Sequence, residues 1–170
     1  MKFLLLLVMF ALMFFSAIID VKLVMIFAFS VLLIGGYIIY KEKIGQELIV
    51  AFLVAVAITS YYVYEYTSFN LFIGRINLFP LISWTFGLVI LREIYEKVKI
   101  KYKWFFVSIL YVIVLFALEY LGYYILGIHL NWNYESLFGI GIIHAPLGMK
   151  VFYVFAGPIY LLITDYLRTK

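Results

Sequence analysis

Long apolar runs are the feature that most limits what this chain can fold into. There are six of them, at about residues 3–19, 22–40, 48–66, 77–95, 104–128 and 146–167. A bilayer core is about 30 Å thick, and a helix of roughly 20 apolar residues spans it. Only 13% of the residues are charged, whereas soluble domains carry roughly 25%. We therefore predict an all-α integral membrane protein with six transmembrane helices.

The six runs leave no room for a soluble domain, and no linker or low-complexity tract divides them. Residues 1–170 are therefore predicted to form a single transmembrane domain. The chain has no cysteine, which excludes a disulfide framework, a thiolate metal site and a cysteine nucleophile. Its net charge of +4 does not indicate binding to nucleic acid, because the basic residues lie in loops beside the spans.

The basic residues also predict how the spans are oriented, because cytoplasmic loops carry an excess of lysine and arginine. Two connections are basic, with Lys41-Glu42-Lys43 in one and Arg92, Lys97, Lys99, Lys101 and Lys103 in the other. Lys2, Arg168 and Lys170 fall on the same side, whereas Lys22, Arg75 and Lys150 are left for the outer side. We predict a multi-pass protein of the cell membrane with both termini in the cytoplasm.

The first run, at residues 3–19, allows a second interpretation. Lys2 followed by an apolar run is also typical of a cleavable signal peptide. No small-x-small cleavage motif precedes Asp20, however, and the charge bias fits six spans only if this segment stays as a helix. We therefore count it as the first span.

One sequence pattern occurs twice. The first copy consists of Glu65-Tyr66, Gly74-Arg75-Ile76 and Pro80-Leu81, and the second of Glu119-Tyr120, Gly139 to Ile143 and Pro146-Leu147. This echo predicts that the third and fourth spans are repeated by the fifth and sixth. In the predicted orientation, both copies place their polar residues toward the outer side of the membrane.

Glu119 is the most unusual residue in this pattern. It follows Trp104, the start of the fifth run, by fifteen residues, which at about 1.5 Å per residue places it about 22 Å along the helix, in the outer third of the bilayer core. An unpaired carboxylate there costs roughly 2.5 kcal/mol or more, so we expect Glu119 to face the bundle interior. A buried carboxyl group can act as a general acid. It can equally be structural, bonded to Lys150, His144 or Asn77.

Other polar residues are predicted to gather at the same outer end. Glu119 and Glu65 are the candidate catalytic residues, and the candidate substrate-binding residues are Arg75, Asn77, Trp132, Tyr134, Glu135, His144 and Lys150. Each also has a structural explanation: a glutamate at a helix end often serves as a cap, and long basic side chains snorkel toward water. His129 and His144 lack a third ligand, so we expect neither a metal site nor a cofactor.

The last run contains Pro158 directly after Gly157. A proline inside a helix removes one backbone hydrogen bond and clashes with the preceding turn. We therefore predict a kink there, with a backbone carbonyl group released near Val154 or Phe155.

The motifs of the second copy resemble those of the membrane-embedded lycopene cyclase domain of carotenoid biosynthesis. In that family an acidic residue near a helix end is followed by a Gly-x-Trp-x-Tyr loop, a Gly-Ile-x-Ile segment and a Pro-x-Glu-Glu motif. The matching residues here are Glu119, Trp132-Asn133-Tyr134, Gly139 to Ile143, and Pro146-Leu147 followed by Phe152-Tyr153. The resemblance covers residues 60–167 and implies that the protein binds or converts a hydrophobic isoprenoid or carotenoid-like lipid, in a pocket open toward the outer leaflet.

One departure bears on the chemistry that this resemblance implies. The two glutamates after the proline are expected to handle the protons of cyclisation in that family. The corresponding residues here are Ile82-Ser83 and Gly148-Met149. If the protein is an enzyme, the resemblance implies an isomerase or cyclase that works without these acid pairs.

Two other functions fit the same features. Six spans with a polar outer pocket also suit the substrate-binding subunit of a small-molecule transporter, although the first run lacks the alanine-rich coupling signature of that class. A non-catalytic subunit of a membrane complex, as a homo-oligomer or hetero-oligomer, suits the loss of the acid pairs. An ion channel is disfavoured, because the inner half of every span is expected to be apolar.

Overall fold

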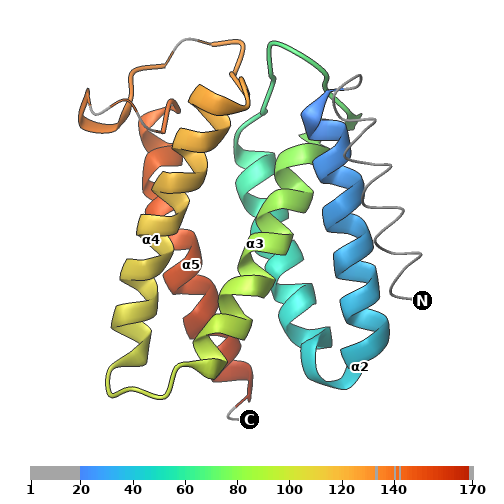
Figure 1. The fold of residues 1–170 in the computed structure, drawn as a ribbon, viewed down its shortest axis with the longest axis vertical. Coiled ribbons are helices and arrows are strands. Elements are labelled where there is room, and N and C mark those ends of the chain that lie inside the picture. Colours follow the sequence, from blue (N-terminus) through green and yellow to red (C-terminus); the bar gives the residue numbers. More distant parts are fainter. Residues whose placement is uncertain (1–19, 133, 140, 142, 169–170) are drawn as a thin grey trace.

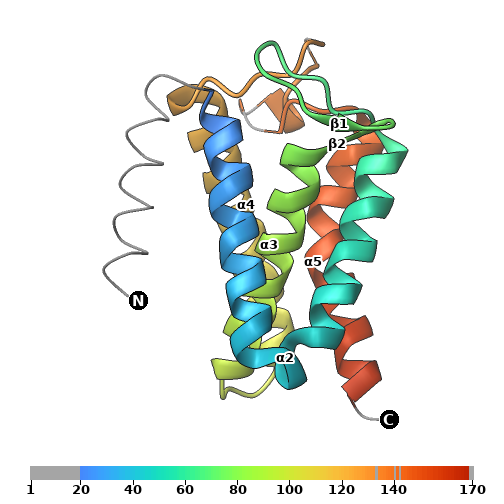
Figure 2. The ribbon, with the colours of Figure 1, turned by 90° about the vertical axis from the view of Figure 1, so that its right-hand side faces the viewer.

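The structure is a computed structural model that describes residues 20–132, 134–139, 141 and 143–168. Five helical segments in this part are long and apolar enough to cross a membrane: Val21–Tyr40, Ile44–Tyr61, Leu78–Lys97, Lys103–Ile125 and Leu147–Arg168. They stand side by side and alternate in direction (Figures 1 and 2). The prediction of a mostly helical chain with membrane-spanning helices is confirmed. The first predicted span, residues 3–19, lies outside the described residues.

The two ends of the bundle differ in their connections. At one end, the upper end in Figure 1, residues 62–77 and 126–146 form two long connections. We call this the loop end. At the opposite end lie a kink in α2, the short segment 98–102 and the last residues of α5. We call this the basic end.

Helix α2, Val21–Tyr61, consists of two arms that form two antiparallel spans. Tyr40 has a non-helical backbone (φ −124°, ψ 30°) that separates two arms. The predicted interruption at Lys41-Glu42-Lys43 is therefore a kink. The second arm ends at Tyr61, and the next residue is extended (φ −129°, ψ 127°). The prediction that this span continues to residue 66 is wrong.

Helix α3, Leu78–Lys97, follows a short hairpin. Strands β1, Phe72–Ile73, and β2, Ile76–Asn77, pair antiparallel, and Gly74 at their turn has a φ of +61°, which favours glycine. The side-chain oxygen of Asn77 accepts a hydrogen bond from the backbone N–H of Phe79 at 3.0 Å and caps the helix. This small extended segment was not predicted.

Helix α4, Lys103–Tyr120, continues into a π-helical turn, η1, Leu121–Ile125. The backbone N–H of Leu126 donates to the carbonyl group of Leu121 at 3.0 Å and closes this turn. A single 3₁₀ turn, η2, Leu137–Gly139, precedes α5, Leu147–Arg168. Because π turns inside helices occur frequently at functional sites, the position of Glu119 just before η1 is of interest.

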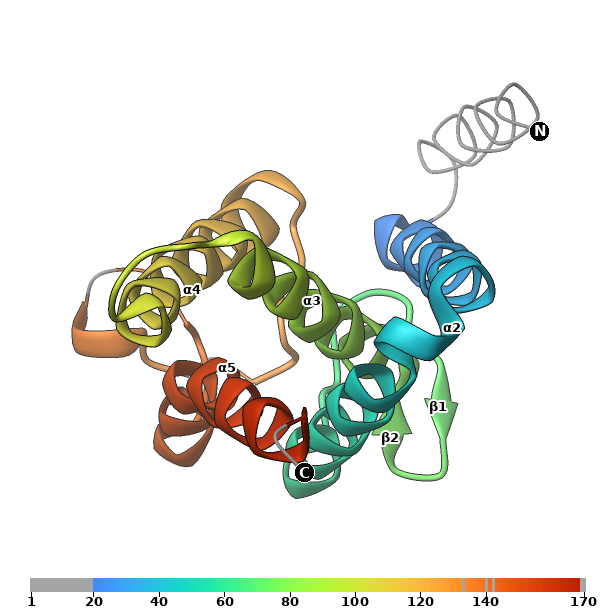
Figure 3. The same ribbon diagram turned by 90° about the horizontal axis from the view of Figure 1, so that it is seen from below.

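The core consists of two buried clusters, one in each half of the bundle. The cluster at the loop end contains Ile26, Ile58, Tyr64, Tyr66, Phe79, Ile143, Ala145, Met149, Tyr153 and Ala156. The cluster nearer the basic end contains Ala51, Leu88, Val89, Leu91, Tyr95, Val107, Tyr160 and Leu161. Viewed along the bundle, α4 and the first arm of α2 lie on opposite sides (Figure 3). Both expose mostly apolar side chains, as lipid-facing helices do.

Helix α4 packs against α5 close to Pro158. The hydroxyl group of Tyr111 donates to the backbone carbonyl of Tyr153 at 2.6 Å, one residue before the predicted Val154. A Cβ atom added at Gly157 would lie 2.8 Å from the ring of Tyr111. The glycine before Pro158 therefore lets the tyrosine ring approach the α5 backbone closely.

Candidate functional site

Glu119 lies half-buried on α4, two residues before the π-helical turn η1 that leads to the loop end. Its carboxylate interacts electrostatically with four tyrosine side chains: Tyr64, Tyr66, Tyr111 and Tyr153. Within the described part of the chain, no hydrogen bond or ion pair joins it to Lys150, His144 or Asn77, the three structural partners considered above. The charge of Glu119 therefore acts on phenol groups from three parts of the bundle: the segment after α2, α4 and α5.

Three of these tyrosines form a compact buried group. The hydroxyl groups of Tyr64 and Tyr153 are 3.3 Å apart, and the rings of Tyr64 and Tyr66 stack with centroids 6.4 Å apart. Trp84 packs against Tyr153 at 5.1 Å. Burial, with a further contribution from the charge of Glu119, raises the pKa of Tyr64 and Tyr66. Both phenols therefore stay neutral and keep their hydroxyl protons for hydrogen bonding.

Local sequence explains how Tyr64 and Tyr66 come to lie together. In an extended chain, alternate side chains point to the same side, and here Tyr64 and Tyr66 are buried while Glu65 between them is exposed. The amide of Asn77 donates to the backbone carbonyl of Tyr64 at 2.9 Å. The side chain of Asn70 accepts from the backbone N–H of Tyr66 at 2.9 Å and donates to its carbonyl group at 2.8 Å. Both asparagines thus hold this segment in place.

The two long connections of the loop end are joined by backbone hydrogen bonds. The N–H of Thr67 donates to the carbonyl of His129 at 3.0 Å, and the N–H of Asn131 donates to the carbonyl of Glu65 at 2.8 Å. The structure therefore brings the two copies of the sequence pattern into contact.

Glu65 contributes its backbone to this contact, while its side chain is exposed. Its charge acts on Tyr62, whose ring packs edge-on against Tyr64 with centroids 5.2 Å apart. Burial, followed by the effects of Tyr134 and Glu65, raises the pKa of Tyr62. Glu65 therefore acts on Tyr62, which packs against Tyr64, whereas Glu119 acts on Tyr64 and Tyr66 themselves.

Tyr123 in η1 joins the two histidines. Its ring stacks on His144 with centroids 3.9 Å apart and meets His129 edge-on at 4.2 Å. Burial, followed by the charges of His129 and Lys150, lowers the pKa of His144. The neutral imidazole is thus the favoured form in this stack. In the described ranges, no three histidine, aspartate or glutamate side chains are close enough to hold a metal ion.

The remaining predicted site residues lie around this group. The Nζ atom of Lys150 donates to the backbone carbonyl of Glu135 at 2.8 Å, so its partner is the main chain and not a carboxylate. Tyr134 is half-buried and packs against Tyr62 with centroids 6.0 Å apart. Arg75, Trp132 and Glu135 are exposed.

The sequence interpretation missed an ion pair at the start of α2. Lys22, only 1% exposed, donates to Asp20 at 3.0 Å and to the hydroxyl group of Ser68, and it lies over the ring of Tyr66. Burial alone would raise the pKa of Asp20, but hydrogen bonds from Ser68, Lys22 and the backbone N–H of Phe69 together lower it. The pair ties α2 to the segment that carries the buried tyrosines.

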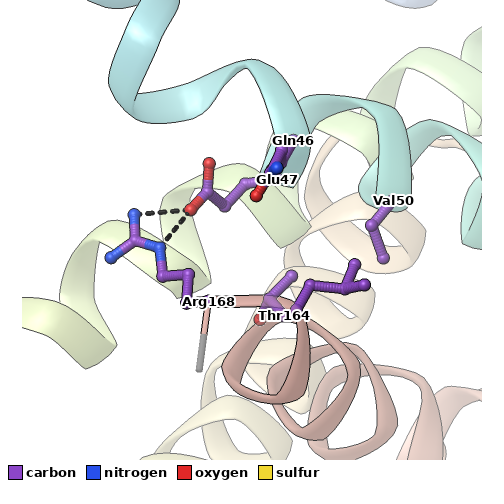
Figure 4. A pocket seen from close by; sticks show the side chains of 6 residues that line it. Gln46, Glu47, Val50, Thr164 and Arg168 are labelled. Carbon is purple, nitrogen blue, oxygen red and sulfur yellow. Dashed lines mark hydrogen bonds and ion pairs between the residues drawn. The ribbon is translucent and has the colours of Figure 1, made fainter. Parts of the chain in front are cut away.

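A second group of charges lies at the basic end, the end that the predicted orientation assigns to the cytoplasm, and there the helices are not wholly apolar as expected. Arg92 is 4% exposed and Glu47 is 3% exposed. Arg92 pairs with Asp165 at 2.5 Å and with Glu96 at 3.3 Å. Arg168 pairs with Glu47 at 2.5 Å (Figure 4). It also pairs with Glu96. This ion-pair network links α2, α3 and α5.

A shallow pocket adjoins this network (Figure 4). It is lined by Gln46, Glu47, Val50, Thr164, Leu167 and Arg168, and it encloses about 150 Å³ including space open to the surroundings. Ligand sites usually measure about 300–1,000 Å³. The pocket is therefore too small for a lipid, and the network serves to hold the helices together.

No protein-family model, no curated protein and no solved structure matches the chain. Functional inference therefore rests on the residues and their geometry.

Proposed function

We propose that this is a six-span membrane protein with cytoplasmic termini whose loop end binds a hydrophobic, isoprenoid-like lipid and acts on it through Glu119. The observation that carries the proposal is the position of Glu119. It lies in an apolar span, its charge acts on four tyrosine side chains, and it has no ion pair to any residue that the structure describes. A carboxyl group inside a membrane span raises the free energy of the folded protein, so its presence there indicates a functional role.

The proposal counts residues 3–19 as the first of the six spans. It also holds that the third and fourth spans are repeated by the fifth and sixth. In support of the repeat, the second arm of α2 with α3, and α4 with α5, form two helix pairs that run in the same directions. Each pair is joined by a long connection at the loop end, and a proline lies close to the start of each second helix, Pro80 in α3 and Pro146 before α5.

The surroundings of Glu119 suit an apolar substrate with double bonds. In the reaction that the resemblance to lycopene cyclase domains suggests, the carboxyl group gives a proton to a terminal double bond. The neighbouring double bond closes the ring, and the carboxylate takes a proton back from the adjacent carbon, so that the product is an isomer. The aromatic faces of Trp84, Tyr64 and Tyr153 would stabilise the intermediate cation.

The missing acid pairs limit which residues can carry the proton in this reaction. Ile82 and Ser83 in α3, and Gly148 and Met149 in α5, stand where the family has glutamates. A single carboxyl group, Glu119, would therefore both donate and recover the proton. Glu65 is exposed at the surface of the tyrosine group and would act on the charge of the site from outside.

The test is mass spectrometry of lipids that copurify with the protein in mild detergent. We expect wild type and Glu93→Gln, the same change at a half-buried carboxylate of α3 near the basic end, to retain the same isoprenoid-class lipid. Glu119→Gln should lose it or leave it unconverted. Equal retention and conversion by Glu119→Gln would refute the role of Glu119. A bound water-soluble metabolite would indicate a transporter subunit, and a stoichiometric partner protein without lipid would indicate an assembly subunit.

A further inference from the structure

The connection between α3 and α4 carries a dense row of lysines. Residues 97–103 read Lys-Val-Lys-Ile-Lys-Tyr-Lys, and we call them the lysine segment. Lys97, Lys99 and Lys101 are exposed. The segment contains no acidic residue, so its positive charge is not balanced from within.

Three acidic residues at this end of the bundle are paired with arginines. Glu47, Glu96 and Asp165 form the ion-pair network with the two arginines. Lys103 joins that network, because its Nζ atom lies 4.0 Å from the centre of the Tyr95 ring and its charge acts on Asp165. In the part of the chain that the structure describes, no carboxylate forms an ion pair with Lys97, Lys99 or Lys101.

Apolar side chains are interleaved with these lysines. Ile100 is 51% exposed and Tyr102 is 69% exposed, and the Nζ atom of Lys101 lies 5.0 Å from the centre of the Tyr102 ring. Aromatic rings and lysines are the residues that occupy the headgroup level of a bilayer. A segment that contains both lysines and exposed apolar or aromatic side chains is therefore more stable at a membrane surface than in bulk water.

The helices fix where this segment lies. Helix α3 ends at Lys97 and α4 begins at Lys103, so the connection remains directly at the ends of two membrane-spanning helices (Figure 1, lower left). In a bilayer spanned by these helices, its exposed lysines would lie at the depth of the lipid headgroups, where anionic lipids create a negative surface potential.

We propose that the lysine segment binds the phosphate groups of anionic phospholipids. A lysine close to an anionic bilayer contributes roughly a fivefold increase in affinity, so two of them together contribute about 25-fold. An acidic soluble protein is the other partner of matching charge. The short reach of the connection and its exposed Ile100 and Tyr102 favour the lipid.

The experiment is a titration of phosphatidylglycerol or phosphatidylcholine into the purified protein in detergent, read by native mass spectrometry. We expect wild type to prefer phosphatidylglycerol and Lys99→Gln/Lys101→Gln to bind it about 25-fold more weakly. Leu71→Glu/Ile73→Glu is the matched control, since it changes the net charge by the same two units at exposed positions of the opposite end. It should bind within twofold of wild type.

Three results would overturn the proposal. The double variant could bind phosphatidylglycerol as tightly as wild type, wild type could bind both lipids equally, or the segment could bind an acidic protein without any preference for anionic lipid. Salt provides a measurement on wild type alone, in case the double variant does not fold. Affinity for phosphatidylglycerol should decrease as the salt concentration is raised from 50 to 500 mM, because salt screens the attraction between exposed charges. Affinity that does not change with salt contradicts the proposal.

Discussion

The hydroxyl groups of Tyr64 and Tyr153 lie 3.3 Å apart and join positions separated by 89 residues. One tyrosine belongs to the extended segment after α2 and the other to α5. Because both are buried, this contact joins the extended segment after α2 to helix α5 inside the candidate site.

Tyr64→Phe and Tyr153→Phe should each lower the free energy of unfolding by about 0.5–1.5 kcal/mol, the usual net value of one hydrogen bond. The double variant should cost less than the sum of the two, because they share one contact. Unfolding in detergent measures all three proteins, with exposed Tyr37→Phe as a control that should have no effect. Strict additivity would show that the two hydroxyl groups are not coupled.

Gly157→Ala should destabilise the protein by about 1–3 kcal/mol, because the added methyl group would meet the Tyr111 ring in a packed interface. Gly87→Ala is the matched change in α3, where a Cβ atom meets no atom within 4 Å. It should stabilise the protein by about 0.4–1 kcal/mol through the lower entropy of the unfolded chain. The two melting temperatures should move in opposite directions, and a shared direction would contradict the packing described for Tyr111.

Arg92→Met should lower the free energy of unfolding by about 3 kcal/mol or more, since it leaves Asp165 and Glu96 without their buried partner. Arg75→Met removes an exposed arginine at the other end and should change stability by less than about 0.5 kcal/mol. Chemical unfolding of both variants is the measurement. Equal stability of the two would mean that the network contributes nothing.

Acidification should destabilise the protein through His144. Its pKa in the folded state is lowered below the ordinary value of 6.5. On acidification the unfolded chain therefore takes up the proton first. Stability decreases as the pH falls from about 6.5 to the pKa of the folded state. Asp20, whose pKa is lowered from 3.8, contributes stability that is lost only below that value. Melting temperatures between pH 7.5 and 5 should therefore fall more steeply for wild type than for His144→Gln, and parallel curves would exclude His144 as the cause.

Hydropathy was sufficient to predict most of the described helices. The runs predicted at 22–40, 77–95, 104–128 and 146–167 differ from the observed spans by at most three residues at either end. The run predicted at 48–66 was placed wrongly, because Tyr62, Tyr64 and Tyr66 add apolar character to a segment that is extended. Their spacing of two residues, typical of an extended chain and not of a helix, was the signal that could have corrected it.

The ion-pair network could be predicted only in part. Arg92 and Glu96 are four residues apart and would face the same side of a helix, but Arg92 had been assigned to a cytoplasmic connection. Their other partners, Asp165 and Arg168, come from a distant helix, and a single sequence carries no sign of that contact. Averaging hydropathy along the chain also conceals a charge whose partner lies on another span.

The pairing of Glu47 with Arg168 has a consequence for biosynthesis. The two residues are 121 positions apart, so a ribosome adding about 5–20 residues per second needs roughly 6 to 24 s to make the second after the first. During that interval, Glu47 lies in the membrane without Arg168, its ion-pair partner. The helices of this protein can thus be inserted one after another, but their basic ends can lock together only once α5 has been made.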